Sequence, residues 1–136
     1  MPDNKPDILY QIAPAVANAD LNELFRAAWP DHHWSNFDPV LSRSLSYVCA
    51  YQGDQLIGFV NIAWDGGIHA FILDTTVHPI VRRQGIGVTL VKQAAKVAQE
   101  RGIKWLHVDY EPHLTAFYRQ CGGYRRRVDG PVSWFL

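Results

Sequence analysis

The stretch VHPIVRRQGIGVTLVKQAAK, residues 77–96, decides how the middle of the chain is interpreted. It places Gly85 and Gly87 directly before a helical pattern in which apolar residues recur on one face. Glycine is costly in a helix, so the two glycines indicate that something needs the bare backbone there. Arg82 and Arg83 add positive charge beside it. Because a helix N-terminus attracts anions, the stretch predicts a phosphate or pyrophosphate site.

Two well-known phosphate loops do not fit this stretch. A Walker loop requires Lys-Ser or Lys-Thr after its last glycine, where this chain has Val88-Thr89. A dinucleotide fingerprint requires a third glycine, where this chain has Leu90. A strand–turn–helix with glycines for tight packing and no ligand remains an alternative.

A third pattern does fit, namely Arg82-x-x-Gly85-x-Gly87 behind a strand that ends in Val77-x-Pro79. This arrangement resembles the coenzyme A loop of the GNAT superfamily of N-acetyltransferases. The wider segment DTTVHPIVRRQGIGVTLV, residues 74–91, is similar to the whole family segment, and TAFYRQCGGY, residues 115–124, is similar to the family helix with its Phe-Tyr pair. The expected order of elements also matches from residue 8 to residue 136.

Strand and helix patterns alternate along the chain. Strands are expected at 8–14, 46–52, 55–64, 69–77 and 103–111, with one or two more within 122–136; helices are expected at 20–29, 87–101 and 113–121, with a helical turn at 40–45. This order predicts a mixed sheet with helices on its faces. The resemblance implies an α/β (α+β) fold. It has a largely antiparallel sheet of six to seven strands, about four flanking helices, and a splayed strand pair that holds coenzyme A.

Composition bounds the function classes. The chain has 136 residues, of which 48% are hydrophobic, and a formal net charge of zero, so we expect one globular domain over residues 1–136. The charge balance argues against a general affinity for nucleic acid or an anionic membrane. Without a signal-peptide pattern or a membrane-length apolar run, the expected location is cytoplasmic. Cys49 and Cys121 are expected to be free thiols. The sequence leaves open whether the chain forms a homodimer.

The resemblance implies acetyl-CoA as co-substrate and no metal. Thr76 and Val77 would contact the pantetheine arm through their backbone, and the Val77 N–H would polarise the thioester carbonyl. The pyrophosphate would be bound by the loop, which comprises Arg82, Arg83, Gln84, Gly85, Ile86 and Gly87.

Tyr118 matches the family tyrosine that protonates the leaving thiolate; without the resemblance, a packed core aromatic would be the favoured role. Asp74 is the candidate base, or an anchor for the substrate ammonium, and strand alternation places it on one face with Ile72 and Thr76. A structural hydrogen bond is the alternative role. Glu111 is a second candidate for the base and for acceptor contact, and a water chain would leave no single base. Cys121 as a covalent acetyl carrier is less favoured than Cys121 as a packed side chain.

The acceptor pocket is expected at AAWPDHHWSNFDP, residues 27–39. Trp29, Trp34 and Phe37, with Trp64 from a strand, would form an aromatic wall there, and Asp31 and Asp38 would attract a cation. Tryptophans that simply cover a small core are the equal alternative. The predicted function is transfer of acetyl from acetyl-CoA to a primary amine of an unidentified small molecule or peptide by direct attack. A non-catalytic module that binds or senses acyl-CoA is the alternative.

Overall fold

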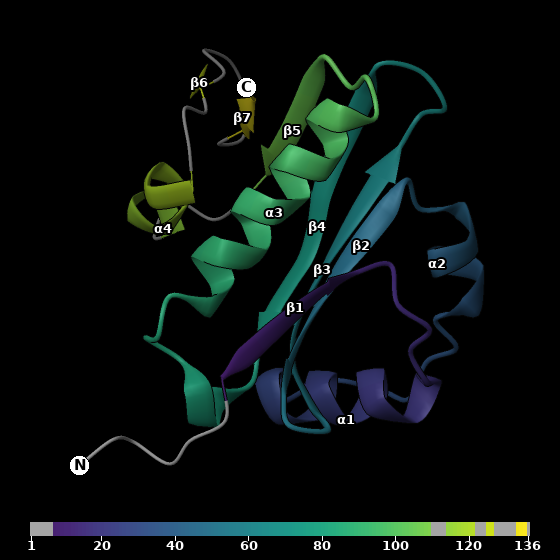
Figure 1. The fold of residues 1–136 in the computed structure, drawn as a ribbon, viewed down its shortest axis with the longest axis vertical. Coiled ribbons are helices and arrows are strands. Elements are labelled where there is room, and N and C mark those ends of the chain that lie inside the picture. The colour runs from purple at the N-terminus through teal and green to yellow at the C-terminus, as the bar shows by residue number, and fades with distance from the viewer. Residues whose placement is uncertain (1–6, 110–113, 122–124, 127–132, 136) are drawn as a thin grey trace.

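The computed structural model describes residues 7–109, 114–121, 125–126 and 133–135. Figure 1 shows the chain as a ribbon. In chain order the elements are β1 (Ile8–Ile12), α1 (Asn18–Ala28), α2 (Asp38–Arg43), β2 (Ser46–Gln52), β3 (Gln55–Trp64), β4 (His69–Val77), a 3-10 turn η1 (Pro79–Val81), α3 (Ile86–Glu100), β5 (Trp105–Asp109), α4 (Thr115–Cys121), β6 (Arg125–Arg126) and β7 (Ser133–Phe135).

The strands in the described part of the chain form one seven-stranded sheet in the order β1-β2-β3-β4-β5-β7-β6. All neighbours are antiparallel except β4 and β5. Gly53, at a φ of +60°, turns the β2–β3 hairpin, in which Gln52 pairs with Gln55. Parallel strands need a long crossover, and α3 provides it between β4 and β5. The expected mixed α+β class is therefore confirmed.

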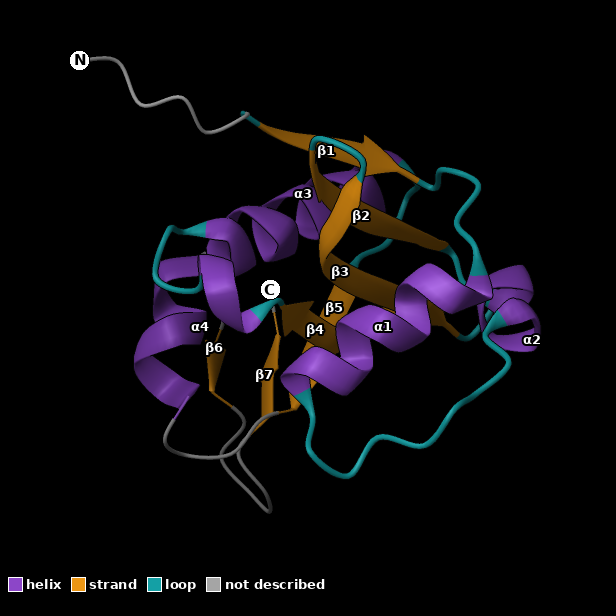
Figure 2. Ribbon diagram, turned by 90° about the horizontal axis from the view of Figure 1, so that it is seen from below, coloured by secondary structure: helices purple, strands orange, loops and turns teal. Residues whose placement is uncertain are grey.

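The helices cover both faces of the sheet (Figures 1 and 2). α3 packs on β2, β3 and β4 and contacts α4, and α1 packs on β3 and β4 from the other side. Two apolar clusters result: a large one between α3 and the sheet and a smaller one under α1 that includes Leu21, Leu24 and Phe59. No helix of the described residues is both long enough and apolar enough to cross a bilayer.

Several element boundaries differ from the sequence expectation for local reasons. β1 ends at Ile12 because Ala13 takes a positive φ of 49° and Pro14 follows it. The helical turn expected at 40–45 is α2 at Asp38–Arg43, because Pro39 is favoured in the first turn of a helix. β5 is described from Trp105 to Asp109, so the expected strand end at Glu111 lies outside the described residues.

Candidate functional site

β4 leaves one of its two neighbours part of the way along its length. From His69 to Ile72 it pairs with β5, and from Ala70 to Ile72 it pairs with β3 as well; the last pair with β5 joins Ile72 to Val108. From Leu73 to Val77 its pairs among the described residues are with β3 alone. Figure 1 shows β4 running on past the end of β5. The described residues thus agree with the splayed strand pair expected from the resemblance, and the chain directly after Asp109 lies outside them.

A β-bulge marks the point where the strands separate. Asn61 pairs with Leu73 and Phe59 with Thr76, so the single residue between them on β3 faces two residues of β4, Asp74 and Thr75. Asp74 takes a φ of +58°, in the left-handed region that few residues other than glycine adopt. A bulge shifts the alternation of side chains by one residue.

This bulge corrects the expectation that Asp74 shares a face with Ile72 and Thr76. Ile72 and Val77 both pack in the large cluster beneath α3, although they are five residues apart and would lie on opposite faces of a regular strand. Thr76 instead faces α1, where its hydroxyl accepts a hydrogen bond from the Trp29 indole N–H at 3.2 Å. Strand alternation fails here because it assumes an unbroken register with β3.

The backbone N–H of Val77 points into the opening. The next residue, His78, donates its N–H to the Ile57 carbonyl of β3 at 2.8 Å. Because hydrogen-bonded and non-hydrogen-bonded positions alternate in an antiparallel pair, the Val77 N–H and C=O point away from β3. They face the side of β4 that β5 no longer occupies, and the Arg82 guanidinium contacts the Val77 carbonyl at 3.4 Å.

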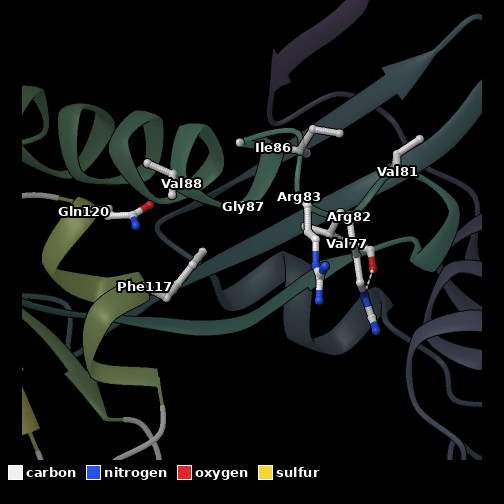
Figure 3. Close-up of a pocket in the computed structure, with 10 residues that line it drawn as sticks. Val77, Val81, Arg82, Arg83, Ile86, Gly87, Val88, Phe117 and Gln120 are labelled. Carbon is white, nitrogen blue, oxygen red and sulfur yellow. Dashed lines mark hydrogen bonds between the residues drawn. The ribbon is translucent and has the colours of Figure 1, made fainter.

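The loop after β4 presents an open helix N-terminus. Gly85 is the N-cap of α3 at a φ of +76°, and no side chain caps the helix. The first N–H groups of α3 therefore have no side-chain partner and favour an anion. Figure 3 shows Arg82 and Arg83 extending in the same direction from this loop, opposite Phe117 of α4. Arg83 takes a φ of +66°, a strained conformation that is often found at binding sites.

A cavity of about 370 Å³ lies at this helix N-terminus. Its lining comprises Val77, Val81, Arg82, Arg83, Gly85, Ile86, Gly87, Val88, Phe117 and Gln120. Five of the six loop residues expected to bind the coenzyme thus surround one cavity, and Gln84 is not among the residues that line it.

The two glycines of the loop serve different purposes. Gly85 adopts a backbone angle that a residue with a side chain rarely takes, and a Cβ there would meet no atom within 4 Å. A Cβ at Gly87 would lie 3.1 Å from two ring atoms of Phe117 and 3.5 Å from Val77 Cγ2. Gly87 therefore permits close packing of α4 on α3, a role beyond the ligand approach inferred from the sequence.

A second cavity of about 320 Å³ adjoins the first. We call it the chamber; it is lined by Ala28, Trp29, Thr75, Thr76, Val77, Arg82, Gly87, Leu114, Phe117 and Tyr118. The two cavities have Val77, Arg82, Gly87 and Phe117 in common. The chamber thus gathers the open end of β4, the end of α1 and one side of α4.

Hydrogen bonds hold one wall of the chamber. The Trp29 indole N–H donates to the Thr76 hydroxyl, which donates to the Asp74 carbonyl at 2.8 Å. The carbonyl belongs to the bulge residue itself, so these bonds tie the end of α1 to the bulge. The Arg82 guanidinium also reaches the Ala28 carbonyl, at 3.5 Å.

Tyr118 lies on α4 and lines the chamber with only 8% of its surface exposed. Its ring meets that of Phe117 edge-on at 4.8 Å between centroids. Cys121, one turn later, is buried, and burial raises the pKa of its thiol to about 11. A thiol with that pKa is a poor nucleophile, which agrees with packing as the role of Cys121.

Asp74 does not line the chamber, although the residues after it do. Its side chain reaches solvent, yet enough protein surrounds the carboxyl group that desolvation raises its pKa above the ordinary value for aspartate. A raised pKa suits a carboxylate that must take up a proton. Glu111, the other candidate base, lies outside the described residues.

Of the four residues expected to form an aromatic wall, only Trp29 lines the chamber, and Phe37 packs against the cluster under α1. Trp29 lines the chamber, whereas Trp64 lines a separate groove beside α2. Trp34 is 64% exposed and lines neither. Trp64 pairs with Ala70, in the part of β4 that also pairs with β5, so it lies apart from Trp29 and the chamber.

Thr75 was missed by the sequence interpretation. It lines the chamber, and its buried hydroxyl oxygen has no hydrogen-bond partner among the described residues. Its side chain faces this way only because the bulge shifts the alternation, so no sequence signal pointed to it.

Known proteins resemble the chain in sequence and in fold. Residues 15–123 match the acetyltransferase (GNAT) family. An "Uncharacterized N-acetyltransferase ycf52-like" from Prochlorococcus marinus is 27% identical over 108 residues, which cover 76% of this chain and 60% of that protein. The match therefore spans about 60% of the relative's length.

Solved structures give the same result. A GNAT family acetyltransferase from Streptococcus pneumoniae is 29% identical with a TM-score of 0.71, covering 86% of this chain and 87% of that one. An acetyltransferase from Bacillus subtilis, solved in complex with CoA, has the same fold with a TM-score of 0.74 at 18% identity, over 96% and 98% of the two chains. The family match spans most of the chain, and the splayed strands and the glycine loop lie inside it. The chain belongs to the GNAT family of acetyltransferases.

Proposed function

We propose that this chain transfers an acetyl group from acetyl-CoA to a primary amine by direct attack. One observation supports this above all: the cavity at the uncapped N-terminus of α3 adjoins the chamber at the opening of β4. A ligand with a pyrophosphate at one end and a thioester at the other would occupy both. Relatives solved with CoA bound agree with this ligand.

The residues of the site have separate roles in this proposal. Arg82, Arg83 and the first N–H groups of α3 bind the pyrophosphate by charge and hydrogen bonds. Acetyl-CoA supplies an activated acyl group as a thioester. The Val77 N–H donates to the thioester carbonyl and stabilises the negative charge that develops on its oxygen. Thr76 contributes its backbone to the wall along which the pantetheine arm lies.

Proton transfer falls to two side chains. Tyr118 gives its phenolic proton to the departing sulfur, since it is the tyrosine that lines the chamber. Asp74 accepts a proton from the acceptor ammonium, or binds that ammonium by its charge. The amine nitrogen forms a bond to the acetyl carbon, the C–S bond breaks, and one proton is released for each amide formed.

The experiment is acetyl-CoA turnover over a panel of primary amines, combined with calorimetric binding of CoA. We expect micromolar-range coenzyme binding and turnover with at least one amine class. Arg83→Gln should weaken CoA binding about tenfold, the value of one charge-assisted hydrogen bond. Lys96→Gln, an exposed charge further along α3, is the matched control and should leave the affinity unchanged.

The outcomes separate an enzyme from a sensing module. Coenzyme binding that depends on Arg83, without turnover on any amine, would replace the transferase by a module that binds acyl-CoA. Equal affinity of the Arg83→Gln variant and the unaltered protein would remove the pyrophosphate from this loop.

A further inference from the structure

A groove separate from the chamber lies beside α2. It has a volume of about 310 Å³ and lies between α2 and strands β3 and β4, on the face of the sheet that carries α1. We call it the α2 groove; its lining includes Val40, Arg43, Asn61, Ala63, Trp64 and Leu73. Figure 2 shows α1 and α2 on the same side of the sheet.

The walls of the α2 groove are apolar and open. Val40, Trp64 and Leu73 are 46%, 39% and 44% exposed, so three large apolar side chains face solvent around one hollow. Single exposed apolar side chains are common on protein surfaces. Several exposed apolar side chains around one groove are typical of a binding site for an apolar group. An apolar body on the ligand would bury these surfaces.

One side chain in the lining carries a charge, and it is a cation. Arg43 is exposed at the C-terminal end of α2 and donates one guanidinium N–H to the Pro39 carbonyl at 3.3 Å. No carboxylate of the described residues pairs with it. A guanidinium offers paired donors that match a carboxylate, so the groove is suited to bind an anionic group.

The groove and the chamber meet on β4. Leu73 lines the groove and Thr75 lines the chamber, and Asp74 is the one residue between them. Two residues of extended chain span at most about 7 Å, so a ligand in the groove is within reach of the chamber. Asp74 therefore lies in sequence between a residue of the groove and a residue of the chamber, although it lines neither.

We propose that the α2 groove binds the acceptor, and that the acceptor is an amino carboxylate with an apolar side chain. Its carboxylate contacts Arg43, its side chain covers Trp64 and Leu73, and its amine lies at Asp74, facing the chamber. This inference rests on the proposed acetyl transfer and names the substrate class. The chemistry is unchanged: the amine nitrogen gains the acetyl group, the C–S bond breaks, and sulfur gains a proton from Tyr118. Of the two protons that the ammonium loses, one restores Tyr118 and the other is released through Asp74.

Charge complementarity favours this class over other amines. A polyamine would place a second ammonium group near the Arg43 guanidinium, and like charges in contact repel. An amino sugar phosphate has an anionic group but no apolar body to cover Val40, Trp64 and Leu73. An amine that also has a carboxylate and an aliphatic or aromatic side chain matches both the Arg43 guanidinium and the apolar lining.

The test compares acceptors that differ only in the carboxylate. Leucine, leucinamide and isoamylamine, and the corresponding phenylalanine set, are assayed with the unaltered enzyme and with Arg43→Gln. We expect the free amino acid to have a kcat/KM about tenfold or more above its amide, the value of a charge-assisted hydrogen bond. In Arg43→Gln the preference should vanish through a higher KM, with kcat and the use of the amide unchanged.

Two controls keep the result interpretable. Arg26→Gln removes one exposed charge from α1, outside the groove and the chamber, and should keep the preference. Calorimetric binding of N-acetyl-leucine to the two proteins without acetyl-CoA should be about tenfold weaker for Arg43→Gln. This second readout does not depend on turnover.

The outcomes also separate this inference from the proposed function. If amines are acetylated but the amino acid and its amide are used equally, or if a polyamine or amino sugar phosphate is preferred, the acceptor class is wrong and the transferase stands. If no amine is acetylated, the proposed function fails, and N-acetyl-leucine binding that depends on Arg43 would still support the groove as a carboxylate site. Binding that does not depend on Arg43 overturns it.

Discussion

The two halves of β4 behave as different kinds of strand. The first half, residues 69–72, pairs with β5 throughout and with β3 from Ala70 onward, and it buries Ala70 and Ile72 almost completely, at 0% and 3% exposed. The second half, residues 73–77, pairs on one side, contains a bulge with a positive φ, and borders the chamber and the α2 groove. These last five residues of β4 thus stay paired with β3 but have no partner in β5 among the described residues.

The difference shows how one element supports both the fold and a binding site. Backbone N–H and C=O groups that lose a strand partner must find another, in water or in a ligand. The second half of β4 has such groups, and the first half fixes their position because it is paired on both sides. We therefore expect substitutions in the first half to change stability and substitutions around the second half to change chemistry.

The largest expected effect is a loss of stability caused by a substitution in the first half of β4. Ile72→Ala removes a buried side chain from the cluster under α3 and should lower the free energy of unfolding by about 2–5 kcal/mol. Denaturant titration measures the loss, and turnover per folded molecule should be nearly normal. If the folded variant loses its activity, the two halves are not separable. Ile72→Val, which should cost about 1 kcal/mol, extends the measurement should the alanine variant be too unstable.

The next largest effect is expected on turnover in Tyr118→Phe. Tyr118 lines the chamber beside the second half of β4. The change removes the phenolic proton and keeps the ring against Phe117, so turnover should fall about 10²-fold or more while CoA affinity is retained. Tyr47→Phe is the matched control, since the Tyr47 hydroxyl donates to the Pro14 carbonyl far from the chamber. It should cost about 1 kcal/mol of stability and no activity. Near-normal turnover of Tyr118→Phe would remove this tyrosine from the mechanism.

The sequence predicts the regular elements well, but it does not predict the bulge in β4. Apolar periodicity and the turn at Gly53 were enough to predict β2, β3 and α3 and the order of the elements, because these depend on local patterns. The same alternation rule was wrong at Asp74, since a bulge depends on how β3 pairs with β4. Aspartate tolerates a positive φ better than most residues, but nothing local in the sequence indicates that Asp74 adopts one, so the orientation of Thr75 could not be predicted.

The candidate site shows the same division. Gly85 and the two arginines could be identified from one contiguous stretch of sequence. The separation of Trp29 from Trp64 could not, because it depends on where α1 and β3 end in space. The contact of Gly87 with Phe117 likewise joins residues thirty positions apart.

Asp74→Asn gives the third effect. Asparagine keeps the size and tolerates the positive φ, so the bulge should persist while the charge is lost. We expect kcat/KM for the amine to fall about tenfold. If Asp74 is the base, kcat falls and the acidic limb of the pH–rate profile, set by a carboxyl with a raised pKa, changes; if it is an anchor, KM rises instead. Full activity with an unshifted profile would leave the proton to Glu111 or water.

The same variant has a signature in stability. Because desolvation raises the pKa of Asp74 in the folded protein, the native state holds its proton more tightly than the unfolded chain does. Stability from this group is present below the unfolded pKa and is lost as pH rises through the folded pKa. Relative to the unaltered protein, Asp74→Asn should therefore be more stable above that window than below it. Urea unfolding across this pH range measures the difference, and an opposite sign would contradict the desolvation of Asp74.

The smallest expected effects are on stability and CoA affinity, and they compare two glycines at the opposite ends of α3. Gly85 and Gly102 have φ values of +76° and +85°, and a Cβ at either would meet no atom within 4 Å. Alanine at each position should therefore cost about 1 kcal/mol, from backbone strain alone. Only Gly85→Ala should also weaken CoA binding, by about fivefold, because relaxing its turn moves the N–H groups at the start of α3. Equal CoA affinities of the two variants, at equal losses of stability, would mean that Gly85 serves the turn and not the ligand.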